Sequence, residues 1–276
     1  MKVFIIIVHF GENSTTANCI KSILAKEKDF EKIIVVDNSS DFKKEEMSEK
    51  VVLLKNKTNL GFAKAVNIGI NYAMARKADY ILLLNNDTVI KMPIIKNLTE
   101  FLSETKEAGI VAPAISFTKN EQILFDVGGR VNKLFGRTSH NEVLQLENKN
   151  PLKTDYVSGC CMLIKKEVIE KIGLLDERFF LYYEDVDYCL RAKKLGLLTY
   201  VLPSVSIYHC LSQTIGKNSS LAVYHQTKSA LQFGKKYFKG IKRVSNIIFI
   251  TFQSLYLFSR SPGLGRAVFS ALLDNL

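Results

Sequence analysis

The sequence predicts an α/β fold with a mostly parallel central sheet and a C-terminal helical, basic tail. Short apolar runs rich in Val and Ile alternate with helical patterns through the first half of the chain. The 276 residues, 47% of them hydrophobic, suffice for one large α/β domain or two small ones. The last third, from Tyr188 onward, holds twelve bases against one acid and so carries the whole net charge of +11. This asymmetry indicates an anionic partner, which membrane phospholipid, nucleic acid or a phosphorylated substrate would fit.

The first half is expected to form βαβ units. The predicted strands are Val3–Val8, Lys32–Val36, Val51–Leu54, Tyr80–Leu84 and Ile110–Ala112. The predicted helices are Ser14–Ala25, Phe62–Arg76 and Met92–Lys106, with Pro93 in the first turn of the last one. This alternation is typical of a Rossmann-like, nucleotide-binding sheet covered on both faces.

The alternation stops after Ala112. Gly128, Gly129, Gly136 and polar clusters up to Pro151 predict hairpins or a mobile loop region. Order resumes with a strand at Tyr156–Ile164, helices at Lys166–Ile172 and Glu184–Leu195, and a strand at Leu198–Leu202.

The tail combines an apolar stretch with a basic cluster. Ile247–Phe258 follows Lys235, Lys236, Lys239, Lys242 and Arg243. A membrane-spanning helix needs about 20 apolar residues, and this stretch is shorter. We expect it to lie in a membrane interface, the alternative being a helix packed on the domain with a solvated basic face.

The cysteines and the N-terminus indicate the cytoplasm. The five cysteines are an odd number without a CxxC pair, which argues against structural zinc and for reduced thiols. The apolar run Val3–Val8 is too short for a signal peptide, and we predict that it forms the first strand.

Two acidic segments carry the chemistry. Asn85-Asn86-Asp87 ends the apolar run of the fourth strand, and Glu184-Asp185-Val186-Asp187 follows an aromatic stretch. A carboxylate at the end of a buried strand lies where an α/β sheet usually binds its ligand. If the segments meet in space, one can hold a cation and the other can take a proton.

Five segments, in order, resemble the inverting family-2 glycosyltransferases with the GT-A fold, and most closely the rhamnosyltransferase-like members that build bacterial surface polysaccharides. The segments are Val35–Ser40, Asn59–Gly69, Leu84–Thr88, Ser158–Met162 and Phe180–Asp187. The resemblance spans roughly residues 1–235. It implies a nucleotide-sugar-binding half over 1–112 and an acceptor-binding and catalytic half over 113–235, followed by a tail over 236–276 for the membrane surface.

The resemblance implies a donor site at the edge of the sheet. Asp37 would accept a hydrogen bond from the imide N–H of uracil or thymine, although Asp-Asn-Ser-Ser is also good turn chemistry. Asn59, Gly61 and Asn67 would contact the nucleotide sugar near a helix N-terminus, where free N–H groups favour phosphate. Asn86 would be a further contact to the nucleotide sugar. A helix cap or a surface role is the alternative for Asn59 and Asn67.

The resemblance also implies a metal site and a base. Asp87 occupies the metal-binding position of the Asp-x-Asp signature, with His209 as a further ligand for Mg²⁺ or Mn²⁺. The first acidic position of that signature is Asn85, which removes one charge. Asp185 would be the general base, its pKa raised by crowded acids, while Glu184 and Asp187 orient the acceptor or the base. An acidic first helical turn is the structural alternative.

The expected activity is inverting, metal-dependent transfer of a sugar, with rhamnose as one candidate. The donor would be dTDP- or UDP-linked, and the acceptor a glycan or lipid-linked oligosaccharide at the inner face of the cell membrane. A catalytically inactive nucleotide-sugar-binding scaffold at the membrane is the alternative. The absence of GxGxxG argues against a dinucleotide oxidoreductase, and the loop after the first strand lacks the Gly-rich, basic pattern of a sugar-nucleotide pyrophosphorylase. Nucleic acid is not an expected partner, because the bases accompany an apolar tail.

Overall fold

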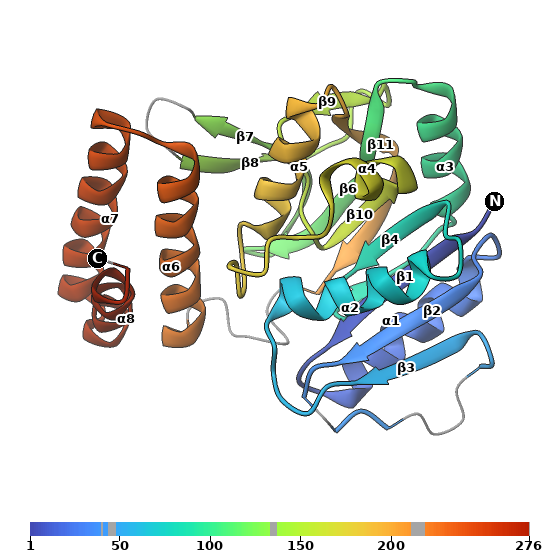
Figure 1. Cartoon of the computed structure of the whole chain (residues 1–276), viewed down its shortest axis with the longest axis horizontal. Coiled ribbons are helices and arrows are strands. Elements are labelled where there is room, and N and C mark those ends of the chain that lie inside the picture. Colours follow the sequence, from blue (N-terminus) through green and yellow to red (C-terminus); the bar gives the residue numbers. More distant parts are fainter. Residues whose placement is uncertain (40, 44–47, 133–136, 211–218, 276) are drawn as a thin grey trace.

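One large mixed sheet organises the molecule (Figure 1). The computed structural model describes residues 1–39, 41–43, 48–132, 137–210 and 219–275, so that Ser40 and Gly136 lie outside it. The strand order is β3-β2-β1-β4-β10-β6-β11-β5, with β7 and β8 continuing from β6 and β9 pairing with β11. The strands are β1 (Val3–His9), β2 (Lys32–Asp37), β3 (Val51–Lys55), β4 (Tyr80–Leu84), β5 (Thr88–Val89), β6 (Ala108–Lys119), β7 (Gln122–Asn132), β8 (Arg137–Val143), β9 (Leu152–Thr154), β10 (Cys161–Lys165) and β11 (Leu198–His209).

The N-terminal half of the sheet is parallel. Strands β3, β2, β1 and β4 run in one direction, as continuous Val- and Ile-rich runs predict. Strand β10 then enters antiparallel between β4 and β6, and β11 lies parallel to β6. The carboxyl ends of β1, β2 and β4 therefore share one edge, where the polar segments predicted to bind ligand begin.

Helices cover both faces of the sheet. They are α1 (Asn13–Lys26), α2 (Phe62–Met74), α3 (Ile95–Glu104), α4 (Lys166–Ile172), α5 (Glu184–Lys194), α6 (Ser220–Tyr237), α7 (Ile241–Arg260) and α8 (Pro262–Leu273). One buried cluster joins the sheet to α1 and α3, and a second joins the opposite face to α2, α4 and α5. The α/β fold, its covered sheet and the helical C-terminal region predicted from the sequence are confirmed.

Several predicted boundaries are wrong. Helix α3 begins at Ile95 rather than Met92, and Pro93 precedes it. The predicted strand Tyr156–Ile164 starts only at Cys161, because residues 159–160 form a turn. Among the described residues of the region 113–151, β7 pairs antiparallel with both β6 and β8, which confirms the predicted hairpins. Strand β11 continues past Leu202 and ends at His209, so the histidine lies at a strand terminus.

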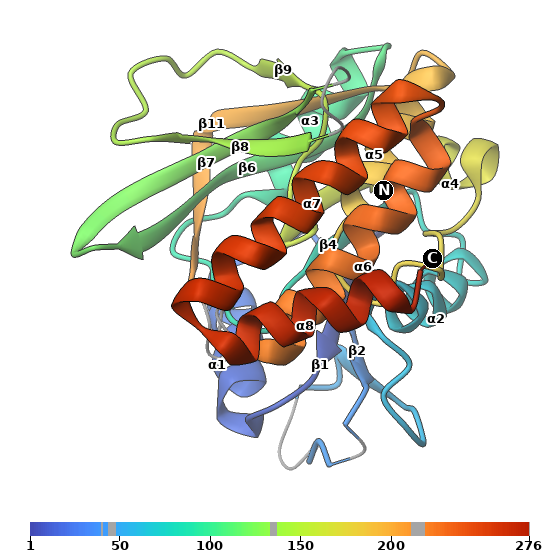
Figure 2. The same cartoon turned by 90° about the vertical axis from the view of Figure 1, so that its left-hand side faces the viewer.

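The three C-terminal helices form a unit beside the sheet, with α7 on its outer side (Figures 1 and 2). Ile250 of α7 packs with Val268 and Leu272 of α8 in a small buried cluster. The predicted domain boundary between residues 235 and 236 falls inside the last turn of α6. Within the described ranges, no helix has both the length and the apolar character that crossing a bilayer requires.

Candidate active site

An open cleft of about 510 Å³ lies between the β7–β8 hairpin, the start of α5 and the end of β11. Asp185 and His209 both line it, together with Asn85 at the end of β4. One residue of the first acidic segment, Asn85, and two of the second, Glu184 and Asp185, thus line the same cleft.

Asp185 is held by backbone donors at the floor of this cleft. Its Oδ1 accepts a hydrogen bond from the N–H of Val186 at 2.7 Å, and its Oδ2 accepts one from Gly159 at 2.8 Å. Burial raises the pKa of Asp185, and the Gly159 N–H and the charge of His140 oppose that rise. Each oxygen keeps a further lone pair, so the carboxylate is fixed in orientation and still able to accept a proton.

The neighbouring Glu184 is 5% exposed and also lines the cleft. Burial, and then the charge of Asp185, raise its pKa well above the usual value. Two adjacent buried carboxyls cannot both ionise easily, so one of the pair is held protonated at a higher pH than an exposed acid.

Asp187 faces away from the cleft and binds to basic and phenolic groups. Its carboxylate accepts hydrogen bonds from Arg191 at 2.8 Å and Tyr237 at 2.7 Å, and it pairs with Lys236 at 2.5 Å. The last two residues belong to α6. Asp187 is 0% exposed and lies outside the cleft lining, so it fixes α5 against α6, a role that its motif did not predict.

Asp87 and His209 form a direct pair. Asp87 Oδ1 lies 3.0 Å from His209 Nε2, and the backbone N–H of Cys210 donates to the carbonyl of Asp87. Burial alone would lower the pKa of His209, but Cys160 and Asp87 outweigh it and raise that pKa to about 11. Burial raises the pKa of the neighbouring Cys160 thiol to about 11.

The Asp87–His209 pair fits a divalent cation. Two ligand atoms of one ion, each about 2.0–2.2 Å from it, are themselves about 3 Å apart. A carboxylate and a neutral imidazole are both ligands that Mn²⁺ accepts, so an ion bound here would displace the proton of His209. The diphosphate of a donor would supply further oxygens. Whether Asp87 and His209 bind a metal stays a prediction.

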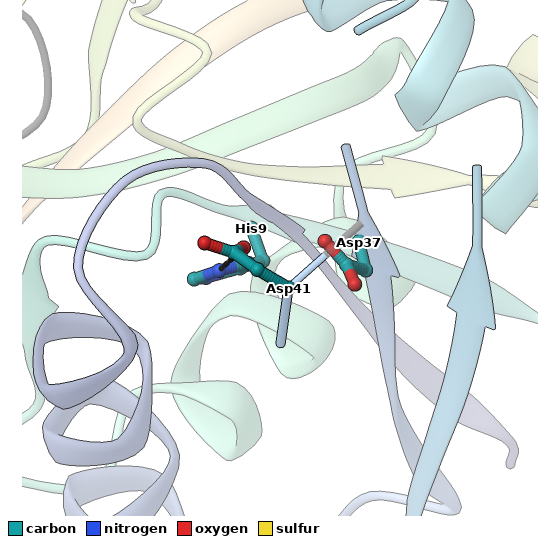
Figure 3. Close-up of side chains that lie close together, drawn as sticks. All are labelled: His9, Asp37 and Asp41. Carbon is teal, nitrogen blue, oxygen red and sulfur yellow. Dashed lines mark hydrogen bonds and ion pairs between the residues drawn. The ribbon is translucent and has the colours of Figure 1, made fainter. Parts of the chain in front are cut away.

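Strands β1 and β2 end in a second group of possible ligands. His9, Asp37 and Asp41 offer one atom each within 4.8 Å of one another, and Figure 3 shows their side chains lying close together. Burial lowers the pKa of His9, so its imidazole is neutral. Of this group the sequence predicted only Asp37, because Asp41 lies four residues beyond the end of β2 and outside the segment Val35–Ser40.

Asp37 also organises its own loop. Its Oδ1 accepts from the N–H of Ser39 and its Oδ2 from the N–H of Phe42. The turn chemistry considered as an alternative is therefore present. Contact of Asp37 with a nucleotide base stays a prediction.

The loop before α2 is tied to the segment before α5. Gly61 has a φ of +82°, and a Cβ there would lie 2.6 Å from Cδ2 and 2.7 Å from the carbonyl oxygen of Phe180. The N–H of Phe62 donates to that same oxygen at 2.7 Å. The Oδ1 of Asn59 accepts from Asn38 at 2.7 Å and from Gly61 at 2.9 Å. Glycine is required here by close approach of the two segments.

Asn67 and Asn86 position loops through their amides. Asn67 exchanges hydrogen bonds with the backbone of Leu175 at 2.9 and 3.0 Å and donates to Glu177. Asn86 donates to the carbonyl of Phe10 and to Thr16 Oγ1. These contacts give both residues structural roles that their motifs did not reveal, and their nucleotide contacts stay predictions.

The β7–β8 hairpin brings residues to the cleft that sequence reasoning missed. His140 Nδ1 lies 2.8 Å from Asp126 Oδ2, and both residues line the cleft. The His140 ring contacts Tyr156 edge to face at 5.3 Å. No spacing signal could have found them, because a hairpin register joins residues 14 positions apart.

Residues 4–173 match the family described as glycosyl transferase family 2. The dTDP-rhamnosyl transferase RfbF of Shigella flexneri is 26% identical over 212 residues, which cover 76% of this chain and 69% of the relative. The N-acetylglucosaminyl-diphospho-decaprenol L-rhamnosyltransferase of Mycobacterium tuberculosis is 28% identical over 199 residues, covering 64% of this chain and 65% of the relative.

Solved structures agree on the fold. GalNAc-T7 with UDP, GalNAc and Mn²⁺ superposes with a TM-score of 0.64 at 14% identity, covering 85% of this chain and 48% of that one. The mannosyltransferase PcManGT from Pyrobaculum calidifontis in complex with GDP-Man and Mn²⁺ gives 0.60 at 12% identity, covering 99% and 86%. The family match spans more than half of the chain, so the protein belongs to glycosyl transferase family 2 and has the GT-A fold.

Proposed function

We propose that this protein transfers a sugar, with rhamnose as the first candidate, from a dTDP- or UDP-linked donor to a glycan or lipid-linked acceptor, with inversion at the anomeric carbon. The observation that carries this proposal is the shared cleft. It joins the oriented carboxylate of Asp185 to His209, which pairs with Asp87. The names of the relatives favour dTDP-rhamnose and a diphospho-lipid acceptor for the first assays.

In the proposed reaction Asp185 takes the proton of an acceptor hydroxyl as that oxygen attacks the anomeric carbon. The new glycosidic bond forms while the bond between the anomeric carbon and the diphosphate oxygen breaks, and the nucleoside diphosphate leaves with both electrons. Backbone donors from Gly159 and Val186 hold the carboxylate in place before the substrate arrives, so little reorganisation is needed.

Asp87 and His209 would hold a divalent cation, Mg²⁺ or Mn²⁺, and leave positions open for the diphosphate. Such an ion supplies positive charge to the leaving group. We prefer this pair over His9, Asp37 and Asp41 because His209 lines the same cleft as Asp185. The latter group lies at the ends of β1 and β2, where Asp37 is proposed to meet the nucleotide base.

We further propose that α7 binds the surface of an anionic bilayer on the inner face of the membrane. An exposed apolar stripe runs along its outer side at intervals of three and four residues. Its members are Ile241 (84% exposed), Val244 (53%), Ile248 (50%), Phe252 (67%) and Leu255 (62%). Exposed bases lie just before this helix, at Lys239, and in its first turn, at Lys242 and Arg243. Apolar and basic groups that coincide on one helix complement anionic lipid, each base near the surface contributing about 1 kcal/mol.

Vesicle flotation tests the lipid assignment. Binding to phosphatidylglycerol vesicles should weaken in Phe252→Ser and with added salt. The control Ile123→Ser changes an exposed apolar residue on β7 (57% exposed) and should bind normally. A second copy of the chain is the competing occupant of the stripe. Equal flotation of both variants, together with a dimer that Phe252→Ser dissociates, would assign the stripe to that copy.

Nucleotide-dependent melting tests the donor site. At about 100 times its Kd, a nucleotide adds about 2.7 kcal/mol to the free energy of unfolding and raises Tm by roughly 5–10 °C. We expect this rise with dTDP or UDP plus Mn²⁺, and a smaller rise with EDTA. Binding without any transfer to lipid-linked acceptors would favour the inactive scaffold, and no shift with any nucleotide would reject the donor site.

A further inference from the structure

The chain enters α5 through two consecutive tyrosines in the left-handed region. Tyr182 has a φ of 68° and Tyr183 a φ of 69°. A β-carbon crowds the following carbonyl oxygen in this conformation, which glycine adopts freely. Non-glycine residues persist there when the surrounding structure fixes them, and they cluster at functional sites. The contacts of each tyrosine side chain should therefore explain why its backbone stays in the left-handed region.

Packing of its ring in the core explains the left-handed backbone of Tyr183. Its ring centroid lies 5.2 Å from that of Phe233 on α6, and the residue packs against the main buried cluster. Tyr182 is half-buried, lines the cleft, and belongs to no buried cluster found among the described residues. Its side chain is placed at the cavity instead of in the core.

A buried carboxyl oxygen without a partner lies in the same wall. Glu184 is 5% exposed and lines the cleft, and among the described residues nothing donates a hydrogen bond to its Oε2. A buried acceptor that is left unsatisfied costs free energy, which a ligand hydroxyl would recover. An aromatic ring and a carboxyl oxygen that line one cleft complement a sugar, which offers C–H groups on a ring face and hydroxyls at its rim.

We propose that Tyr182 and Glu184 form the subsite that binds the acceptor sugar and selects among acceptors. The face of the Tyr182 ring lies against the C–H face of that sugar, and Glu184 Oε2 bonds to one of its hydroxyls. Asp185 lines the same cleft as Glu184, so a neighbouring hydroxyl of the same sugar is brought to the base. This inference rests on the proposed transferase function and adds the residue that determines acceptor specificity.

Three substitutions of Tyr182 separate its ring from its backbone. Tyr182→Phe keeps the ring, Tyr182→Gly removes both the ring and the strain, and Tyr182→Ala removes the ring and keeps the strain. Transfer is measured from dTDP-rhamnose to a synthetic GlcNAc-diphospho-lipid. The acceptor KM should rise about tenfold or more in the Gly and Ala variants alike, while the Phe variant and every donor KM stay within about twofold of wild type.

The melting temperatures of the variants show, independently of activity, whether a substitution changes the stability of the fold. The Ala variant should melt about 2–4 °C below the Gly variant, because only glycine relieves the left-handed strain. Equal acceptor KM values in two variants of unequal stability assign the loss to the missing ring. An acceptor KM within about twofold of wild type in Tyr182→Gly would overturn the subsite.

A wild-type protein that transfers nothing to this acceptor would count against the proposed function, and the subsite is then tested by binding. Saturation-transfer NMR with the methyl β-glycoside of GlcNAc should give signals with the wild type and with Tyr182→Phe, and none with Tyr182→Gly. No signal with the wild type, or equal signals with the wild type and the Gly variant, would overturn the inference.

Discussion

Replacing Asp185 by asparagine should abolish most of the transfer activity and leave the fold intact. The substitution keeps the size of the side chain and removes its ability to take a proton. It also exchanges one carboxylate oxygen for an NH₂ group. That group faces the N–H of either Gly159 or Val186, and two donors cannot form a hydrogen bond. One of the two hydrogen bonds that orient the side chain is therefore lost, and the other survives.

The expected magnitudes follow from these contacts. Loss of a general base lowers kcat by about 10²–10⁴-fold, which corresponds to roughly 2.7–5.4 kcal/mol of transition-state stabilisation. Loss of one hydrogen bond costs about 0.5–1.5 kcal/mol of stability. Removing one acid from the buried Glu184–Asp185 pair should instead raise the stability of the fold. Both pKa values are raised in the folded state, so the pair stabilises the fold less as pH rises through them.

The assay combines kcat, donor binding and melting at pH 7. Asp185→Asn should keep the nucleotide-dependent rise in Tm and melt within about 4 °C of wild type. Asp79→Asn, a half-exposed residue before β4, is the matched control and should retain full activity. In the wild type, kcat should fall as pH drops through the raised pKa of Asp185. Unchanged turnover in Asp185→Asn would refute the assignment of the base.

Three further substitutions test other parts of the site. Asp87→Asn should abolish the Mn²⁺-dependent part of the melting shift with dTDP or UDP, and an unchanged metal dependence would remove Asp87 as a ligand. Gly61→Ala should destabilise the fold by about 2–4 kcal/mol in urea titration, because its Cβ would meet the Phe180 carbonyl at 2.7 Å. Wild-type stability there would contradict the observed approach of the two segments. Tyr237→Phe removes the 2.7 Å hydrogen bond to Asp187 and should lower Tm by about 2–4 °C, and kcat with it. Lowered Tm with unchanged kcat would show that α6 does not position α5 for catalysis.

The sequence predicted the fold where local pattern and tertiary environment agree. Buried strands such as Val3–Val8 and Tyr80–Leu84 are apolar throughout because both faces of the sheet are covered, and the structure confirms them. The predicted β11 was too short because Pro203 and polar residues interrupt its pattern. Pairing with β6 as far as Tyr208, and with β5 at His209, carries the strand on. Pairing between distant strands leaves no local signal.

The site was predicted as a set of residues and not as a set of contacts. Asp185 and His209 both line one cleft. The family resemblance pointed to these two residues, which lie at the start of α5 and at the end of β11. Asp187 belongs to the same motif but points to α6, since successive residues of a helix face different directions. The left-handed backbone of Tyr182 and the Asp126–His140 pair depend on three-dimensional surroundings that no single motif encodes.

The measurement that tests the account most directly is the anomeric configuration of the product. Purified protein, Mn²⁺, dTDP-rhamnose of known anomeric configuration and a GlcNAc-diphospho-lipid are incubated together, and the one-bond C1–H1 coupling of the new linkage is read by NMR. A single displacement with Asp185 as base predicts a linkage of opposite configuration to the donor, made by the wild type and lost in Asp185→Asn. A linkage that retains the donor configuration would contradict the account.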